Sequence, residues 1–174
     1  NKTGKATGLV SDTRITHATL ACFASHVAHR SMEDKIAEQL VNKDTGADIL
    51  LSGGLRHFLP MSANDKTSPV FTRLVNLKAI PVKVKSKRLD DVNVLDYAEN
   101  TAGYELAFSR EDLNSVSGPK VLGLFNYSGM PDAIEETWKR DDPTRRWPTL
   151  DEMTSKALDI LEEDRDGFFL MVEA

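Results

Sequence analysis

The sequence predicts an α/β protein with a mostly parallel central sheet and helices on both of its faces. Short apolar runs without interruption recur along the chain, and segments with helical periodicity lie between them. A strand that is apolar at every position is buried on both faces, as the strands of a parallel sheet are. Of the 174 residues, 40% are hydrophobic, which is enough for one core. We therefore expect a single domain over residues 1–174.

The first third of the chain is predicted to run strand, helix, helix, strand. Residues 8–12 form a short apolar run after a lysine- and glycine-rich entry, and residues 47–54 form another that ends in a glycine turn. Residues 18–29 are predicted to be helical. A second helix is predicted from Ser31, because Asp34 follows as a partial capping-box match and apolar residues then recur every four positions: Met32, Ile36 and Leu40.

The middle of the chain is less regular. Residues 59–69 are rich in turn-forming residues and are predicted to be a loop. Residues 70–77 and 91–100 are predicted helices. Two further apolar runs predict strands at residues 105–108 and 120–125.

Two charged segments are open to more than one interpretation. Residues 81–91 alternate apolar and basic residues, which fits an anion-attracting patch or a solvated edge strand whose lysines block pairing with other strands. We favour the edge strand. The charged run between Trp138 and Trp147 is predicted to be a surface loop.

The last helix and strand have the clearest signals. Thr149 and Glu152 form a complete capping box at the start of a helix. Its apolar positions share one face: Leu150, Met153, Ala157 and Leu161. Gly167 ends this segment, and residues 168–172 form a fully apolar strand.

Composition excludes several classes of protein. A net charge of −5 argues against a nucleic-acid-binding protein, which would carry a basic face. No apolar run of about 18 residues is present, so we expect no membrane span. The single cysteine, Cys22, excludes an intrachain disulfide and is predicted to pack in the core. The first residue is Asn1 rather than Met, so the chain is expected to be processed, excised or a piece of a longer protein.

Polar residues gather where the first and last strands are expected to end. Thr16, His17 and Thr19 follow the first strand, and Glu173 follows the last. Sites in open α/β sheets form at the carboxyl ends of strands, so these residues could be neighbours in space. Arg30, at the expected helix end, would by itself be interpreted as bonding the last helix carbonyls.

One histidine pair is a weaker candidate for a site. His26 and His29 are three residues apart and would lie near one helix face. A surface or helix-end role is favoured over metal binding, because the predicted helix offers them no acidic partner.

Four collinear motifs resemble the alkaline phosphatase family. They are GKATGLVSDTRITHAT with ASHVAHRS, then ADILLSGGLRHF, KVLGLFNYSGMP and PTLDEMTSKALDILEEDRDGFFLMVEA. The resemblance covers essentially the whole chain, as a central segment of the family's fold, so the sheet would be present only in part. Residues 59–118 are the least distinctive and insert-like part. The chain looks most similar to marine, cold-adapted bacterial members.

The resemblance implies roles for four residues. Thr19 and Glu173 match the family's threonine and glutamate ligands of magnesium, and both supply the hard oxygen atoms that this ion prefers. His17 matches a position that acts on this metal site through its water shell. Arg30 matches the arginine that holds two oxygens of the substrate phosphate, a task suited to a planar guanidinium. Two positions depart from the family pattern: Leu20, where proline is usual, and Ala174, where glycine is usual.

The implied enzyme is a metal-dependent phosphomonoesterase that works through a phosphoserine intermediate. Its serine nucleophile, an aspartate that bridges zinc and magnesium, and the ligands of two zinc ions would lie outside residues 1–174, so the chain alone is predicted to be inactive. Expected ligands are phosphate monoesters and inorganic phosphate, with no nucleic acid and no membrane. The family also implies a homodimer that is periplasmic or secreted.

Two other functions also fit an α/β chain with these polar groups. The first is a related α/β metalloenzyme, a phosphodiesterase or phosphomutase. The second is a non-catalytic chain that binds phosphate or a partner. The THAT and LMVE segments favour the phosphomonoesterase.

Overall fold

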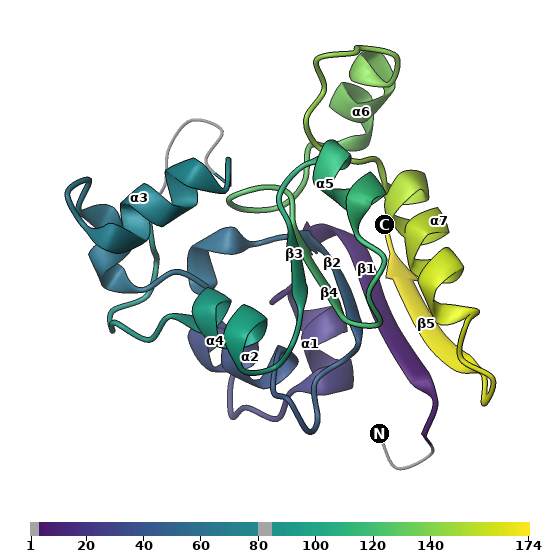
Figure 1. Cartoon of the computed structure of the whole chain (residues 1–174), viewed down its shortest axis with the longest axis horizontal. Coiled ribbons are helices and arrows are strands. Elements are labelled where there is room, and N and C mark those ends of the chain that lie inside the picture. Colours follow the sequence, from purple (N-terminus) through teal and green to yellow (C-terminus); the bar gives the residue numbers. More distant parts are fainter. Residues whose placement is uncertain (1–3, 80–84) are drawn as a thin grey trace.

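The computed structural model describes residues 4–79 and 85–174. Its centre is a five-stranded sheet with the strand order β3-β4-β2-β1-β5 (Figure 1). Every pair of neighbouring strands in this sheet is parallel, so the predicted parallel sheet is confirmed. The strands are β1 (Ala6–Arg14), β2 (Ile49–Gly53), β3 (Glu105–Ala107), β4 (Val121–Leu124) and β5 (Phe168–Glu173).

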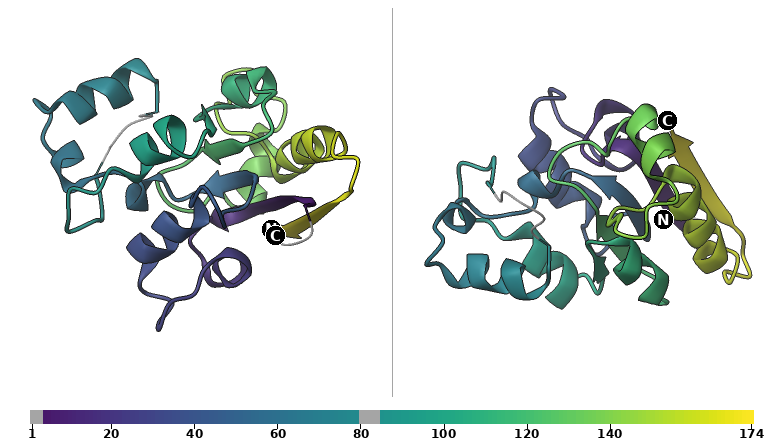
Figure 2. Two further views of the ribbon diagram at one scale, coloured as in Figure 1. Left: turned by 60° about the horizontal axis from the view of Figure 1, so that its bottom comes forward. Right: turned by 90° about the horizontal axis from the view of Figure 1, so that it is seen from above.

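Helices cover both faces of the sheet, as predicted (Figure 2). Adjacent strand residues point to opposite faces: Leu9 and Leu50 belong to one buried cluster, and Val10 and Ile49 to another. The first cluster includes residues of α1 (Ala18–Ala24), α2 (Glu33–Leu40), α3 (Pro69–Asn76) and α4 (Val94–Asn100). The second includes residues of α5 (Arg110–Ser115) and α7 (Leu150–Leu161).

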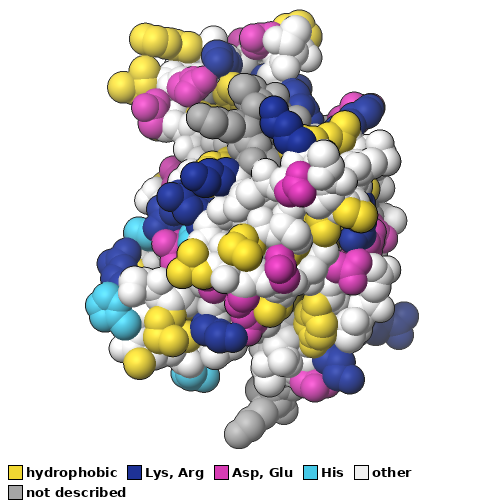
Figure 3. Space-filling model, turned by 90° about the vertical axis from the view of Figure 1, so that its left-hand side faces the viewer, with side chains coloured by type: hydrophobic (Ala, Val, Ile, Leu, Met, Phe, Trp, Pro, Cys, Tyr) yellow, Lys and Arg dark blue, Asp and Glu magenta, His cyan; other side chains and the backbone are white. Residues whose placement is uncertain are grey.

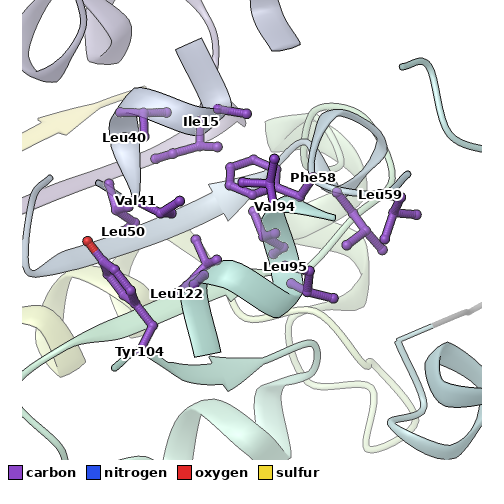
Figure 4. Close-up of a cluster of buried hydrophobic side chains, with 14 of the residues drawn as sticks. Ile15, Leu40, Val41, Leu50, Phe58, Leu59, Val94, Leu95, Tyr104 and Leu122 are labelled. Carbon is purple, nitrogen blue, oxygen red and sulfur yellow. The ribbon is translucent and has the colours of Figure 1, made fainter. Parts of the chain in front are cut away.

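The larger cluster supports the part of the sheet that carries the candidate site. Figure 4 shows Ile15, Leu50, Phe58 and Leu122 converging between the strands and the helices of this face. Ile15 comes directly after β1 and is fully buried, so the chain that leaves the strand is anchored before it reaches α1. The side chains that follow Ile15 are therefore held close to the end of the sheet.

The first two helices are shorter than predicted. The helix expected over residues 18–29 ends at Ala24, and residues 26–32 are irregular. The Ser25 hydroxyl donates to the Ala21 carbonyl, and the Gln39 side chain bonds both the N–H and the carbonyl of His26. These contacts occupy the backbone groups that would have continued the helix.

The prediction of Ser31 as the start of the second helix was also wrong. α2 begins at Glu33, and Met32 occupies the N-cap position without a capping side chain. Glu33 and Asp34 in the first turn instead complement the positive end of the helix dipole.

Two helices and two short 3-10 segments were missed. α5 is capped by Ser109, and α6 (Ala133–Lys139) is capped by Asp132. Trp138 lies in α6, so the loop expected between the two tryptophans is shorter than predicted. The short segments η1 (Leu55–His57) and η2 (Met61–Asn64) follow β2. Both missed helices are too short to show a clear apolar period.

The edge strand expected at residues 81–91 is not found over its described part. Residues 81–84 lie outside the described residues, and Lys85–Asp91 contain no strand. Arg88 is buried instead of solvated, because its guanidinium bonds Glu38 and Asp90. The solvated-strand interpretation was therefore wrong for this part of the segment.

Cys22 was also placed wrongly by the sequence. It is exposed, because α1 buries Leu20 and Ala21 and turns the next positions outward. Across the two described ranges, no helix has the length and apolar character needed to cross a membrane.

The predicted capping box of α7 is confirmed. The Thr149 hydroxyl accepts from the N–H of Glu152, and the Glu152 carboxylate accepts from the N–H of Thr149. Arg145 adds two hydrogen bonds of 3.0 Å to the same carboxylate.

These contacts predict a pH-dependent stability. Burial raises the pKa of Glu152, but the Arg145 and Thr149 hydrogen bonds outweigh burial and bring it to about 2. A carboxyl with a depressed pKa stabilises the fold above its unfolded pKa and loses that contribution as the pH falls. We expect the free energy of unfolding to drop by about 2–3 kcal/mol from this group between about pH 4.5 and 2. Urea unfolding of wild type and Glu152→Gln across this range measures it. A stability difference that does not shrink toward pH 2 would contradict the assignment.

Candidate functional site

The predicted site residues lie at one edge of the sheet, where β1 and β5 end side by side. Ser11 of β1 is paired with Glu173 of β5, and the Ser11 hydroxyl lies 3.5 Å from the Glu173 carboxylate. α1 begins shortly after β1, with His17 at its N-cap and Thr19 in its first turn. The strands that carry the two groups of candidate residues are therefore neighbours, as the strand-end argument predicted.

Acidic groups gather at this edge. Burial raises the pKa of Asp12, and the nearby charge of Glu173 raises it further. Two carboxylates that repel each other in this way favour a cation between or beside them. The backbone carbonyl of Asp12 accepts from the N–H of Met130 at 2.8 Å, so the backbone at Asp12 is held against the loop after β4. Asp12 was not among the predicted site residues, although its position at a strand end was a usable signal.

The chemistry of the donor set fits magnesium but does not complete a site. Thr19 is exposed and Glu173 is partly exposed, and both offer hard oxygen atoms. In the described part of the chain, no group of three or more His, Cys, Asp and Glu side chains is arranged to hold a metal ion. The residues present could supply part of a magnesium shell.

Arg30 contacts His17 rather than a helix carbonyl. Its Nη2 atom lies 3.0 Å from Nε2 of His17, and the arginine side chain is otherwise exposed. Since arginine only donates, Nε2 of His17 accepts, and the proton of the neutral ring is assigned to Nδ1. This Nδ1 atom is buried and has no hydrogen-bond partner among the described atoms. A buried donor without an acceptor is costly, so His17 is set up to bond a water or ligand oxygen.

The segment between β1 and α1 is held by Glu33 at the start of α2. The Glu33 carboxylate accepts two hydrogen bonds from Arg14, at 3.0 and 3.2 Å, and one from the Thr16 hydroxyl at 2.5 Å. Burial raises the pKa of Glu33, but these bonds and the nearby His57 and Arg14 hold it below its usual value. Glu33 is therefore ionised at neutral pH. Sequence reasoning missed this residue because its partners come from other elements.

The loop after β4 lies across the ends of β1 and β2. The N–H of Gly54 donates to the carbonyl of Asn126 at 3.0 Å. At Gly53, a Cβ atom would collide with the backbone carbonyl of Ser128. Gly53 is required there because only glycine lets the two backbones approach so closely. The loop fixes one side of the edge where Asp12 and Glu173 lie.

His26 and His29 do not form a metal pair. Both are exposed and lie in the irregular segment after α1, so they do not share a helix face. Nδ1 of His29 lies 2.8 Å from the Ser31 hydroxyl. The surface role preferred for them agrees with their exposure.

Comparison with known proteins identifies the family. A family model described as alkaline phosphatase matches residues 1–174. Alkaline phosphatase 3 of Bacillus subtilis is 34% identical over 174 residues, which cover 98% of this chain and 30% of that protein. The repressible alkaline phosphatase of Saccharomyces cerevisiae is 37% identical over 186 residues, covering 98% of this chain and 29% of that protein.

Solved structures share the fold. Thermus thermophilus alkaline phosphatase matches with a TM-score of 0.73 and 30% identity, over 99% of this chain and 30% of that one. A cold-active alkaline phosphatase from Shewanella sp. has a TM-score of 0.64 and 28% identity, over 99% of this chain and 32% of that one. Cold-active bacterial enzymes are thus among the similar structures, as the resemblance predicted.

The length of the match limits what is shared. The chain spans about 30% of the length of the curated relatives that it matches. Within that span the family model covers every residue. The chain belongs to the alkaline phosphatase family.

Proposed function

We propose that the protein to which this chain belongs hydrolyses phosphate monoesters through a phosphoserine intermediate. The observation that carries the proposal is the placement of Arg30. Its guanidinium is exposed and lies 3.0 Å from His17, which begins the helix of Thr19, at the edge of the sheet where β5 ends in Glu173. A phosphate-binding arginine and two hard oxygen donors are the groups that such a reaction needs from this part of the fold. The serine nucleophile and the zinc ligands would lie outside these residues.

Arg30 would bind and orient the substrate. Its contact with His17 involves Nη2, which leaves further N–H groups for two oxygens of a phosphate. Parallel N–H donors match the spacing of phosphate oxygens and strengthen as charge develops on the transferring group. Arg30 would therefore hold the phosphoryl group while it is transferred to the serine and while the phosphoserine is hydrolysed.

Thr19, Glu173 and His17 would form this chain's share of the metal centre. Thr19 and Glu173 would ligate magnesium, and the free Nδ1–H of His17 would orient a water in its shell. When bound, magnesium and two zinc ions would supply positive charge to activate the nucleophile and stabilise the leaving oxygen. The repulsion between Asp12 and Glu173 supports a cation at this edge.

The family also suggests the setting in which the protein acts. We propose a homodimer that is periplasmic or secreted, with phosphate monoesters as substrates and inorganic phosphate as product, and with no nucleic-acid or membrane partner. The acidic composition supports the expectation of no nucleic-acid partner, since a net charge of −5 does not favour the binding of polyanions.

The test is hydrolysis of p-nitrophenyl phosphate by the complete protein, with zinc and magnesium and with EDTA. We expect EDTA to abolish turnover, and the 174-residue chain alone to show none. Hydrolysis of bis(p-nitrophenyl) phosphate in preference to the monoester would overturn the proposal in favour of a phosphodiesterase. Phosphate binding without turnover would favour a non-catalytic protein.

Glu173→Gln should weaken the binding of magnesium, so that the activity requires a higher concentration of the ion. The amide keeps the shape of the side chain but removes the negative charge that the ion needs, so we expect activity to fall at least about tenfold at low magnesium. Excess magnesium should restore part of it. Glu163→Gln is the control, because Glu163 is an exposed carboxylate in the turn after α7. Equal magnesium titrations for the two variants would remove Glu173 from the metal centre.

A further inference from the structure

We propose that Glu33 is a positioning residue that sets the phosphate-binding geometry of Arg30, in part through the contact of Arg30 with His17. The inference rests on the proposed function and adds a residue to it. Glu33 touches neither the substrate nor a metal in this proposal. It acts by joining three segments that end at the same edge of the sheet: the segment after β1, the start of α2 and the turn after β2.

The first connection is to the segment that leads from β1 to His17. Arg14 donates to both oxygens of Glu33, and Thr16 donates to Oε2 at 2.5 Å. Thr16 is buried and directly precedes His17. The Glu33 side chain is itself only 16% exposed, so these charged hydrogen bonds are poorly screened by solvent. The position of His17 is therefore tied to the position of α2.

The second connection is to the turn after β2. Nη2 of Arg56 lies 4.0 Å from Oε1 of Glu33. Nε of Arg56 donates to Nε2 of His57 at 3.1 Å, and this acceptor nitrogen lies 3.3 Å from Oε2 of Glu33. Nδ1 of His57 also bonds Asp34, the next residue of α2, at 2.8 Å. Side chains from the end of β1 and from the turn after β2 thus hold the start of α2 together.

The third connection is through the chain itself. Arg30 lies three residues before Glu33, in the irregular segment that precedes α2. Arg30 contacts His17, and Glu33 contacts Thr16, so the same two segments are joined twice. The Arg30 contact is exposed and contributes little by itself. The buried contacts of Glu33 therefore hold the two segments together. The position of Arg30 relative to His17 depends on these contacts.

Basic side chains surround the Glu33 carboxylate. In Figure 3, Lys and Arg side chains lie beside His side chains along one side of the face shown. Within the junction, the single charge of Glu33 is opposed by Arg14 and Arg56. Removing the Glu33 charge would leave these arginines free to move toward a bound phosphate or away from each other. Both changes would disturb Arg30.

The test is a double-mutant cycle in the complete protein, with p-nitrophenyl phosphate as substrate and inorganic phosphate as inhibitor. Glu33→Gln should lower kcat/KM about 10- to 100-fold and weaken phosphate inhibition about tenfold. In an Arg30→Ala background, Glu33→Gln should have little further effect, because Glu33 acts through Arg30. A purely structural role would lower stability and leave the two effects additive, and additivity would overturn the proposal.

Glu152→Gln is the matched control. Glu152 also accepts two hydrogen bonds from one arginine and is also partly buried, but it lies on α7, which packs against the opposite face. It should lower stability without changing kcat/KM or phosphate inhibition. If both variants changed kinetics equally, the proposal would fail.

A milder variant guards against misfolding. Thr16→Val removes one hydrogen bond to Glu33 and keeps the side-chain shape, so a change in the same direction of about threefold is expected. Unchanged phosphate inhibition in Thr16→Val would count against Glu33. An inactive wild type would instead refute the proposed function, so the two failures are distinguishable.

Discussion

Replacing Arg30 with alanine is expected to lower kcat/KM for phosphate monoesters about 10²- to 10³-fold in the complete protein. The alanine removes hydrogen bonds that strengthen as negative charge develops on the phosphoryl oxygens. The stability of the fold should change little, because the Arg30 side chain is exposed and its contact is with His17. Steady-state kinetics together with urea unfolding measures both quantities on the same variant.

Arg30→Lys separates charge from geometry. Lysine keeps the positive charge but loses the planar fork, so we expect it to recover only part of the activity lost in the alanine variant. Arg165→Ala is the control. Arg165 is an exposed arginine in the turn before β5, so it lies at the opposite ends of the strands from the site. A wild-type kcat/KM for Arg30→Ala would mean that phosphate is bound elsewhere.

The sheet could be predicted from the sequence because its signal is local. Each strand is a run of apolar residues, and a run that is buried on both faces predicts a parallel sheet without knowledge of its neighbours. The ends of α1 and α2 could not be predicted in this way. They depend on the Gln39 side chain, which bonds the backbone of His26 from a distant position in the sequence. Such a contact exists only after the helices pack.

The place of the site in the fold could be predicted from the sequence, but the contacts that join its elements could not. The rule that sites form at strand ends placed Glu173 near the residues after β1, and the structure makes the two strands neighbours. The resemblance to alkaline phosphatases supplied the roles of Thr19, Glu173, His17 and Arg30, and these remain proposals. The connections made by Glu33 had no sequence signal, because they join three elements that only the fold brings together.

Arg88 was misread for the same physical reason. A segment rich in lysine and arginine resembles a solvated edge, yet all N–H groups of this guanidinium find acceptors inside the protein. Nε and Nη2 bond Asp90 at 2.6 and 2.9 Å, and Nη2 also bonds Glu38 at 2.6 Å. Nη1 donates to the carbonyls of Asp34 and His57, at 3.1 and 3.2 Å. These bonds join α2 to the turn after β2.

Arg88→Met is therefore expected to destabilise the fold by about 3 kcal/mol. Methionine fills part of the space, but it removes a charged donor from two backbone carbonyls and from Asp90, while Glu38 keeps its ion pair with Lys35. The estimate lies at the lower end for a broken buried ion pair, since the Glu38 and Asp90 side chains are 29% and 45% exposed and can recover water. Urea unfolding of the 174-residue chain gives the value directly.

Arg73→Met is the matched control for this prediction. Arg73 also bonds two carboxylates, Asp96 and Glu99, but its side chain is 33% exposed. Its loss should cost less than about 1 kcal/mol, because water replaces the ion pairs. If both variants were equally destabilised, burial would not be what makes Arg88 important. If Arg88→Met alone unfolds the chain at low urea, the attachment of α2 to the turn after β2 is a principal support of the edge that carries Arg30.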